Sequence, residues 1–352
     1  MGKTLGENFE KIVYIGDLIK KKSIRLLGKR IICKYAFNKN YLSEREPIIL
    51  KNYANQINKK MYNTDIDVIF SPGTLPIAKI ETDKPIVFWT DATFAGMIDF
   101  YPEFSNLCKE SIRNGNKMEK SALQRCELAI YSSEWAAQTA IQNYGIEKAK
   151  VKVVPFGANI ICNRTSDDIK NLIENRSHDK CKLLFMGVDW TRKGGNIAIK
   201  VTKELNKSGL ETELTIVGCK PIIDEPLPSF IKLLGFVSEK EITNLFAESH
   251  FLILPSRADC TPIVFCEANS FGVPCLTTNV GGIPTIIKDG LNGKTFSKDA
   301  DIEEYCKYIF NLFLNYNQYK KLGFSSFNEY QSRLNWSVAG KAVKKLLLES
   351  LS

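Results

Sequence analysis

Two carboxylates lie eight residues apart in a stretch of the sequence that also predicts a helix start. Asp259 precedes the predicted start and Glu267 follows it. At 1.5 Å per residue, Glu267 would lie about 7.5 Å along the helix from its beginning. A carboxylate there could accept two hydrogen bonds from ribose hydroxyls, and Asp259 could reach a sugar on the other side. On spacing alone, a capped surface helix with one solvated glutamate is the better interpretation, so the pair needs further support.

The helix start is predicted by its residue types. An apolar run, Phe251–Leu254, leads to Thr261, a good N-cap, and to Pro262, which suits the first helical position because it lacks an N–H. The backbone amides of Ile263 and Val264 would then point out of the helix without intrahelical partners. Such amides bind anions, so this position predicts a diphosphate site.

Short β-branched runs alternate with helix-like segments, which is typical of an α/β protein with parallel sheets. In the first half, the predicted strands are Lys11–Ile15, Asp67–Phe70, Ile86–Trp89, Leu128–Tyr131 and Val151–Val154. In the second half, they are Lys182–Met186, Glu213–Val217, Phe251–Leu254 and Cys275–Thr277. Helices are predicted from Ser132 or Ser133 to Gly145, over Lys193–Ser208 before Gly209, and from the capping box Ser238–Glu241.

Two domains are expected, because 352 residues exceed one ordinary core. The polar segment Asn163–Lys180 is the predicted linker. It divides an N-terminal domain, residues 1–160, from a C-terminal domain, residues 161–330, both Rossmann-like and facing across a cleft. Residues 331–352 are expected to form a helix that packs back on the first domain. Ligands bind at the carboxyl ends of parallel strands, so the site is expected in the loops that follow them.

Composition argues against several classes of protein. The ten cysteines form no Cys-x-x-Cys pair, and His178 and His250 are the only histidines, so neither a metal site nor a histidine-based triad is expected. No apolar run reaches the roughly 18 residues needed to cross a bilayer. The N-terminus does not resemble a signal segment, and the expected location is cytoplasmic. Nucleic-acid binding is not expected, because no recognition motif accompanies the net charge of +9.

Part of that charge lies in a stretch where basic and apolar residues are interleaved. The cations are Lys20, Lys21, Lys22, Arg25, Lys29 and Arg30, and the apolar residues among them are Ile24, Leu26, Leu27, Ile31 and Ile32. A basic amphipathic helix of this kind could touch the inner face of an anionic membrane. The favoured interpretation is a helix that packs its apolar side on the domain and leaves its charges in solvent.

Several motifs occur in a fixed order between Lys182 and Phe296. They are the acid pair Asp259 and Glu267, the loop Gly187–Gly194 containing Arg192 and Lys193, the strand and turn Leu214–Gly218, the segment Leu234–Val237, and the loop Asn279–Pro284. Together they resemble the donor half of the family-four retaining glycosyltransferases of GT-B fold, with Asp259 and Glu267 at the positions of the Glu-x7-Glu motif. Val154–Asn159 is similar to the segment by which that family leaves its first domain.

The resemblance implies a role for each matched position. Arg192 and Lys193 would neutralise the leaving diphosphate, in the loop that begins at Gly187. Phe236 and Val237 would hold the base, Glu267 the ribose, and Asp259 the transferred sugar. Loss of a nucleoside diphosphate develops negative charge, which fixed cations and helix-start amides stabilise in the transition state. Neither a metal nor a cofactor is implied, and the nucleotide sugar is a substrate.

The sequence departs from the family pattern at four places. Asp259 is one methylene shorter than the family's glutamate, and Val188 stands where the family has an arginine. In the first half, Asp91 follows the strand Ile86–Trp89 where many relatives place a histidine, and it is the candidate for positioning the sugar or acceptor. A turn-forming aspartate is an equal alternative. The polar segment Met1–Glu10 offers no strand or glycine loop, which leads to the hypothesis that the first domain lacks its first strand.

The favoured function is transfer of a sugar from a nucleotide-sugar donor to a hydroxyl of a sugar or lipid-linked acceptor, with retained configuration and without metal. The expected setting is cell-surface polysaccharide or glycolipid synthesis. Two alternatives stay open. One is a weakly active or inactive relative that binds a nucleotide or a partner, and the other is a sugar-nucleotide epimerase of the same fold, against which the scarcity of histidine argues.

Overall fold

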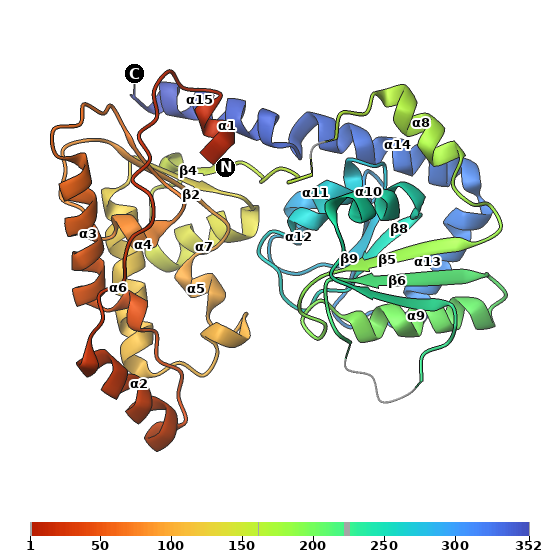
Figure 1. The fold of residues 1–352 in the computed structure, drawn as a ribbon, viewed down its shortest axis with the longest axis horizontal. Helices are drawn as coiled ribbons and strands as arrows, with labels where there is room; N and C mark the ends of the chain where they lie inside the picture. Colours follow the sequence, from red (N-terminus) through yellow and green to blue (C-terminus); the bar gives the residue numbers. More distant parts are fainter. Residues whose placement is uncertain (1, 161, 222–225, 352) are drawn as a thin grey trace. The chain divides into compact units, whose positions relative to one another are not determined.

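The computed structural model describes residues 2–160, 162–221 and 226–351. The chain forms two compact units (Figure 1). Unit 1 comprises Met1–Val154 together with Gly340–Ser352, and unit 2 comprises Pro155–Ala339. The first boundary thus lies six residues before the predicted position at 160, and the return to unit 1 begins nine residues after 331. Each unit is an α/β body built on its own parallel sheet.

Unit 1 contains a four-stranded sheet in the order β1-β2-β3-β4, all parallel. The strands are β1 (Ile69–Ser71), β2 (Ile86–Thr90), β3 (Leu128–Tyr131) and β4 (Val151–Val153). The helices are α1 (Gly2–Gly6), α2 (Ile24–Phe37), α3 (Pro47–Met61), α4 (Thr74–Ile77), α5 (Phe94–Met97), α6 (Lys109–Arg125) and α7 (Glu134–Tyr144). Helix α7 has the predicted ends, because Ser133 caps its start and Gly145 ends it with a φ of 65°.

The predicted strand at Lys11–Ile15 is wrong, since this segment has no regular structure. Its backbone is held by side chains of α3 rather than by a neighbouring strand. The carbonyl of Ile15 accepts a hydrogen bond from Lys60 Nζ, and Gln56 bonds both backbone groups of Ile19. The described residues before Ile69 contain helices and one isolated bridge but no strand, in agreement with a first domain that lacks its usual first strand.

Unit 2 contains a six-stranded parallel sheet in the order β10-β9-β8-β5-β6-β7. The strands are β5 (Cys181–Met186), β6 (Thr212–Val217), β7 (Ile231–Gly235), β8 (Phe251–Leu254), β9 (Cys275–Thr278) and β10 (Gly293–Phe296). From β5 the chain builds the sheet outward through β6 and β7, and it then returns to the other side of β5 with β8. The topological switch point therefore lies between β5 and β8, where doubly wound folds bind ligands.

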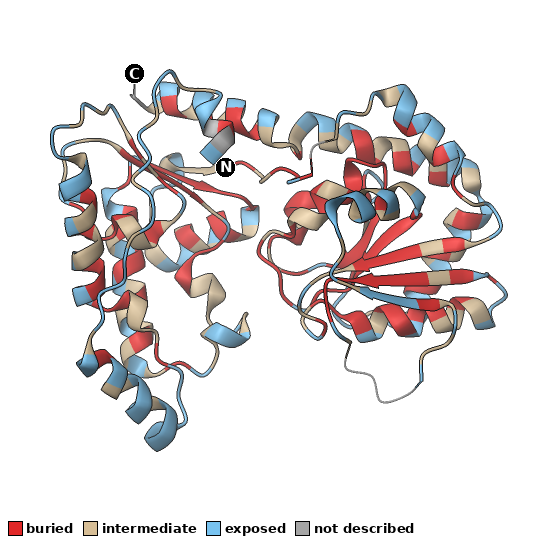
Figure 2. Ribbon diagram, in the orientation of Figure 1, coloured by how far each residue is buried: buried red, intermediate tan, exposed pale blue. Residues whose placement is uncertain are grey.

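Helices cover both faces of this sheet (Figure 1). One face carries α9 (Gly195–Lys207) and α13 (Ile302–Leu314), and the other carries α8 (Ser166–Glu174), α10 (Glu239–Glu248), α11 (Ile263–Asn269) and α14 (Tyr316–Arg333). Short α12 (Ile283–Ile286) follows β9, and α15 (Trp336–Leu351) ends the described chain. Figure 2 shows the strands of unit 2 buried along most of their length, with exposure concentrated on β7 and on the outer faces of the helices.

The segment predicted as a linker is part of the core of unit 2. It contains α8, which a capping box of Thr165 and Asp168 begins, and whose Ile169 and Ile173 are buried. Arg176, 3% exposed, donates to the carbonyls of Ala247, Phe271 and Gly272 and to the hydroxyl of Tyr319. The polar composition of Asn163–Lys180 concealed an amphipathic helix and a buried arginine, so the linker prediction is wrong.

Candidate functional site

The loops that follow β5 and β8 meet at the switch point of unit 2. The first loop, Gly187–Gly194, carries Arg192 and Lys193, and the second, Pro255–Pro262, carries Asp259. Lys193 Nζ donates to Asp259 Oδ2, and Arg192 Nη1 lies 3.5 Å from the same oxygen. The structure therefore brings together the two cations and the first acid that the sequence predicted.

Burial gives this cluster its electrostatic character. Asp259 is 5% exposed and Lys193 is 9% exposed, so their charges are compensated mainly by each other and by Arg192. Asp189 also lies within 3.5 Å of Arg192, but 42% of its side chain is exposed and water screens its charge. The site thus holds two cations beside one buried and one exposed carboxylate. A lysine and an arginine placed together suit an anionic ligand such as a phosphate group.

Backbone contacts fix the distance between the two loops. Gly194 has a φ of +75°, and a Cβ at this position would lie 2.0 Å from the carbonyl oxygen of Pro255. Beside this contact, Arg257 N–H donates to the carbonyl of Arg192 at 2.7 Å, and the Arg257 guanidinium donates to the carbonyl of Thr191. Only a glycine lets the two chains approach so closely, and the approach places Lys193 within reach of Asp259.

Gly187, the predicted first residue of the loop, lies against the aliphatic part of the Lys193 side chain. Its N–H donates to the carbonyl of Val217, and a Cβ there would approach Lys193 Cγ to 3.0 Å. The next loop begins at Gly218, whose φ of +86° turns the chain beside Gly187. Small residues at the ends of β5 and β6 therefore leave room for the lysine side chain.

Helix α11 begins one residue later than predicted, at Ile263. Pro262 is the N-cap residue, with φ −76° and ψ 95°, and no side chain caps the helix. The prediction that Thr261 is the N-cap is therefore wrong, because the extended conformation of Pro262 removes it from the helix. Ile263 and Val264 still occupy the first turn, where backbone amides precede the intrahelical hydrogen bonds.

Glu267 lies half-buried on the second turn of α11. Burial raises its pKa above the ordinary value, while a hydrogen bond from the backbone of Asn159 acts in the opposite direction. Asn159 also accepts a hydrogen bond from Trp336 Nε1 at 3.0 Å, and the Trp336 ring packs at 5.6 Å from that of Phe156. Trp336 is thus a packing anchor, as expected, and the carboxylate of Glu267 is held from the segment that enters unit 2.

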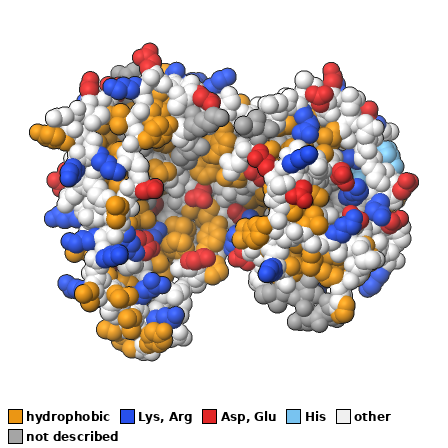
Figure 3. All heavy atoms as spheres, in the orientation of Figure 1, with side chains coloured by type: hydrophobic (Ala, Val, Ile, Leu, Met, Phe, Trp, Pro, Cys, Tyr) orange, Lys and Arg blue, Asp and Glu red, His pale blue; other side chains and the backbone are white. Residues whose placement is uncertain are grey.

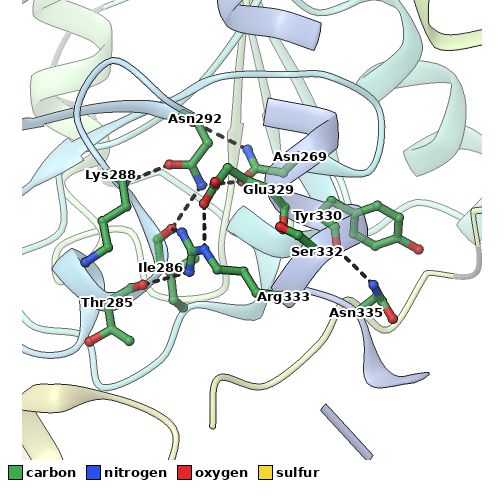
Figure 4. Close-up of polar contacts among 10 residues, drawn as sticks. All are labelled: Asn269, Thr285, Ile286, Lys288, Asn292, Glu329, Tyr330, Ser332, Arg333 and Asn335. Atoms are coloured by element: carbon green, nitrogen blue, oxygen red, sulfur yellow. Dashed lines mark hydrogen bonds and ion pairs between the residues drawn. The ribbon is translucent and has the colours of Figure 1, made fainter. Parts of the chain in front are cut away.

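A polar network fixes the loop after β9 and the short helix α12 (Figure 4). Asn292 Nδ2 donates to Asn269 Oδ1 on α11 and to the carbonyl of Ile286. From α14, Arg333 donates to the carbonyls of Thr285 and Ile286 and pairs with Glu329.

The same loop reaches the acid itself. The N–H of Gly282 donates to the carbonyl of Asp259 at 3.1 Å. The backbone of Asp259 is therefore held by the loop that leads into α12, and Arg333 of α14 in turn holds α12.

The remaining predicted residues lie elsewhere. Phe236 is 80% exposed and Val237 is half-buried. Both follow the carboxyl end of β7, on the side of the sheet where the loops after β5 and β8 also lie. Asp91 belongs to unit 1, where it is exposed at the end of β2 beside Thr93, the N-cap of α5.

Sequence reasoning missed Asp189, Ser256 and Arg257. Asp189 Oδ1 accepts a hydrogen bond from the backbone N–H of Arg192 at 2.9 Å, which closes a turn. The spacing Asp-x-x-Arg could have indicated this turn. Ser256 is 1% exposed, and its Oγ has no hydrogen-bond partner among the described residues. The sequence offered no signal for this buried hydroxyl, because its burial depends on how the two loops meet.

Comparison with known proteins relates unit 2 to a family. Residues 167–326, less than half of the chain, match the family model of the glycosyl transferases group 1. Unit 2 is therefore similar to the domain that this model describes. An uncharacterised 41.2 kDa protein in the cps region of Klebsiella pneumoniae is 27% identical over 177 residues, which cover 50% of this chain and 49% of that protein. The chain thus spans about half the length of this curated relative.

Solved structures show that the fold is that of GT-B glycosyltransferases. The sucrose-phosphate synthase of Thermosynechococcus elongatus matches with a TM-score of 0.67 and 15% identity over 88% of this chain and 80% of that one. HepE of Anabaena, solved in complex with UDP-glucose, matches with a TM-score of 0.62 and 17% identity, over 95% of this chain and 98% of that one.

In the described part of the chain, no group of three His, Cys, Asp or Glu residues is placed to hold a metal ion. None of the described helices is both long and apolar enough to span a bilayer.

Proposed function

We propose that this chain transfers a sugar from a nucleoside diphosphate sugar to a hydroxyl group of an acceptor. The observation that carries this proposal is the placement of Arg192 and Lys193 against buried Asp259 at the switch point of a domain similar to the glycosyl transferases group 1. These cations are fixed before any ligand arrives. Preorganised charges stabilise a leaving diphosphate without reorganisation during the reaction.

Each group in unit 2 has a part in the proposed reaction. Lys193 and Arg192 neutralise the charge that develops on the diphosphate, assisted by the first-turn amides of α11. Asp259 orients the transferred sugar and keeps the two cations in place. Glu267 accepts hydrogen bonds from the ribose, and exposed Phe236 offers an aromatic face for the base.

The finer features of the reaction rest on the family resemblance. Attack from the same face as departure retains the anomeric configuration without a covalent intermediate. The two fixed cations take the part that a metal ion plays in other transferases, so the proposed reaction needs no metal. The acceptor is a sugar or a lipid-linked acceptor, and Asp91 helps to position the transferred sugar or this acceptor. The setting is polysaccharide or glycolipid synthesis at the inner face of a membrane.

Release of nucleoside diphosphate from UDP, GDP and ADP sugars tests the proposal. Wild-type protein is expected to hydrolyse one class of donor slowly in the absence of an acceptor. Lys193→Met is expected to lower kcat by about a hundred-fold, since removal of one charge-stabilising donor typically costs that much. Lys207→Met, at the exposed end of α9, is the matched control and retains full activity.

The outcomes distinguish the candidate functions. Release that is equal in wild type and Lys193→Met contradicts the proposed catalytic cluster. Tight nucleotide binding with no turnover of any donor would show that the chain is a non-catalytic binding module and not an enzyme.

A further inference from the structure

Helix α2 turns its apolar face away from unit 1. Ile24, Leu27, Ile31 and Tyr35 follow one another at intervals of three, four and four residues, which places them on one face of the helix. Their exposed fractions are 90%, 57%, 49% and 78%, and Ile32 beside them is 56% exposed. The expectation that this helix packs its apolar side on the domain is therefore wrong.

The opposite face holds α2 to unit 1. Leu26 is the buried residue of the helix, in a small cluster with Tyr41 and Ile49. Lys29 Nζ lies 2.6 Å from Glu110 and 3.8 Å from Glu46. The inner contacts thus include Leu26, partly buried Cys33 and the ionic contacts of Lys29, and they leave the outer stripe exposed.

The charged residues of α2 and of the segments beside it in the sequence are all basic, and glutamates outside this stretch pair with Lys20 and Lys29. Residues 18–43 contain eight lysines and arginines and no aspartate or glutamate. These eight cations account for all but one of the net positive charges of the chain. Figure 3 shows hydrophobic and basic side chains gathered at the lower left, where Figure 1 places α2. An apolar stripe flanked by cations is the pattern of helices that lie in the surface of an anionic bilayer.

We infer that α2, together with the basic segment 20–22 before it, binds the surface of a membrane that contains anionic phospholipid. The side chains of Ile24, Leu27 and Ile31 insert between the lipid headgroups, and the lysines and arginines contact lipid phosphates. Contact with a second copy of the chain is disfavoured, because it would bring two sets of cations face to face. This surface lies within unit 1, and its binding does not depend on a nucleotide at unit 2.

Sedimentation with lipid vesicles tests this inference. The full chain is mixed, without nucleotide, with vesicles of phosphatidylcholine alone or with added phosphatidylserine. We expect binding to the vesicles that contain phosphatidylserine, weakened by high salt because counterions screen the attraction. A protein that remains in the supernatant with both vesicles overturns the proposal.

Two sets of variants separate the apolar and the ionic contributions. Leu27→Ser with Ile31→Ser is expected to weaken binding at least about thirty-fold, because two exposed aliphatic side chains no longer insert into the membrane surface. Leu314→Ser with Leu348→Ser is the matched control, since both leucines are exposed, on α13 and α15. Replacement of Lys21, Lys22 and Arg25 by serine is expected to weaken binding about a hundred-fold, at about five-fold per cation near an anionic surface.

Circular dichroism and light scattering complete the test. Leu27→Ser with Ile31→Ser removes exposed side chains, so the melting temperature is expected to stay within a few degrees of wild type. Equal vesicle binding by this variant and wild type contradicts the role of α2. A wild-type dimer that the same variant dissociates, without vesicle binding by either, assigns the stripe to a second copy instead.

Discussion

Gly194 is the position where one added methyl group tests how the donor site is built. A Cβ there would lie 2.0 Å from the carbonyl oxygen of Pro255, at a φ of +75°. Gly209, just after α9, has a φ of +86°, but its Cβ would meet nothing within 4 Å. Gly194→Ala and Gly209→Ala therefore impose the same backbone strain. Only Gly194→Ala forces apart the loops that carry Lys193 and Asp259.

The two substitutions differ by the energy of that collision. A left-handed conformation costs an L-residue about 1–2 kcal/mol, which is the whole expected loss for Gly209→Ala. Ordinary contact begins at 3.4 Å, so Gly194→Ala must move Pro255 by about 1.4 Å. Overpacking of this kind costs about 1–3 kcal/mol more. The expected loss for Gly194→Ala is therefore about 2–5 kcal/mol.

Pulse proteolysis in urea measures both losses, because peptides from unit 2 can be quantified apart from those of unit 1. The affinity for nucleoside diphosphate is the second readout, and it is expected to fall in Gly194→Ala and to stay unchanged in Gly209→Ala. Equal destabilisation by the two substitutions would refute the close approach of the loops.

Three further predictions concern buried polar groups. Burial lowers the pKa of His250 to about 3, and its Nδ1 accepts the N–H of Lys182. The neutral ring stabilises unit 2 above pH 6.5, and this contribution falls by about 2 kcal/mol from pH 7 to pH 5. His250→Gln should abolish this pH dependence of the free energy of unfolding. The same pH dependence in wild type and His250→Gln, measured by urea denaturation, would contradict the prediction. Burial raises the pKa of Glu119, which accepts the hydroxyl of Thr74 at 2.8 Å, to about 7. The folded state then binds the proton more tightly than the unfolded state, so the free energy of unfolding of unit 1 should fall by about 2 kcal/mol from pH 5 to pH 8. Glu119→Gln should remove this loss of stability. An increase in the stability of unit 1 over the same pH range would contradict the prediction. Arg176→Met leaves three carbonyls without the guanidinium donor and should destabilise unit 2 by about 3 kcal/mol, at about 1 kcal/mol or more for each unsatisfied carbonyl. Lys170→Met, on the exposed face of α8, should change the urea midpoint little. Similar urea midpoints for the two variants would contradict the role of Arg176 in the core of unit 2.

Elements with strong local signals could be predicted from the sequence. Strands β3 and β8 have the predicted limits, because each is a fully buried apolar run. Strand β7 was missed because its Lys232, Leu233 and Leu234 are exposed on an edge, which breaks the apolar pattern. The capping box of Thr165 and Asp168 was present in the sequence, but the polar residues around it concealed α8.

The candidate site was predictable in its residues and not in its contacts. The family resemblance assigned Arg192, Lys193 and Asp259 to one donor site, and in the structure their side chains are in contact. Their roles in the reaction stay predictions. The partner of Glu267 could not be predicted, since Asn159 lies over a hundred residues earlier in the chain. The spacing of the apolar residues identified the apolar face of α2. It could not tell that the domain packs against the opposite face of the helix and leaves the apolar face in solvent.

Calorimetric titration of the full chain with UDP, GDP and ADP tests the central claim most directly, which is that the switch point of unit 2 binds the diphosphate of a donor. We predict binding of at least one nucleotide, weakened about ten- to a hundred-fold in Lys193→Met because a charge-assisted hydrogen bond is lost. Lys207→Met should bind as wild type does. Absence of binding with all three nucleotides, or equal affinity in wild type and Lys193→Met, would contradict the claim.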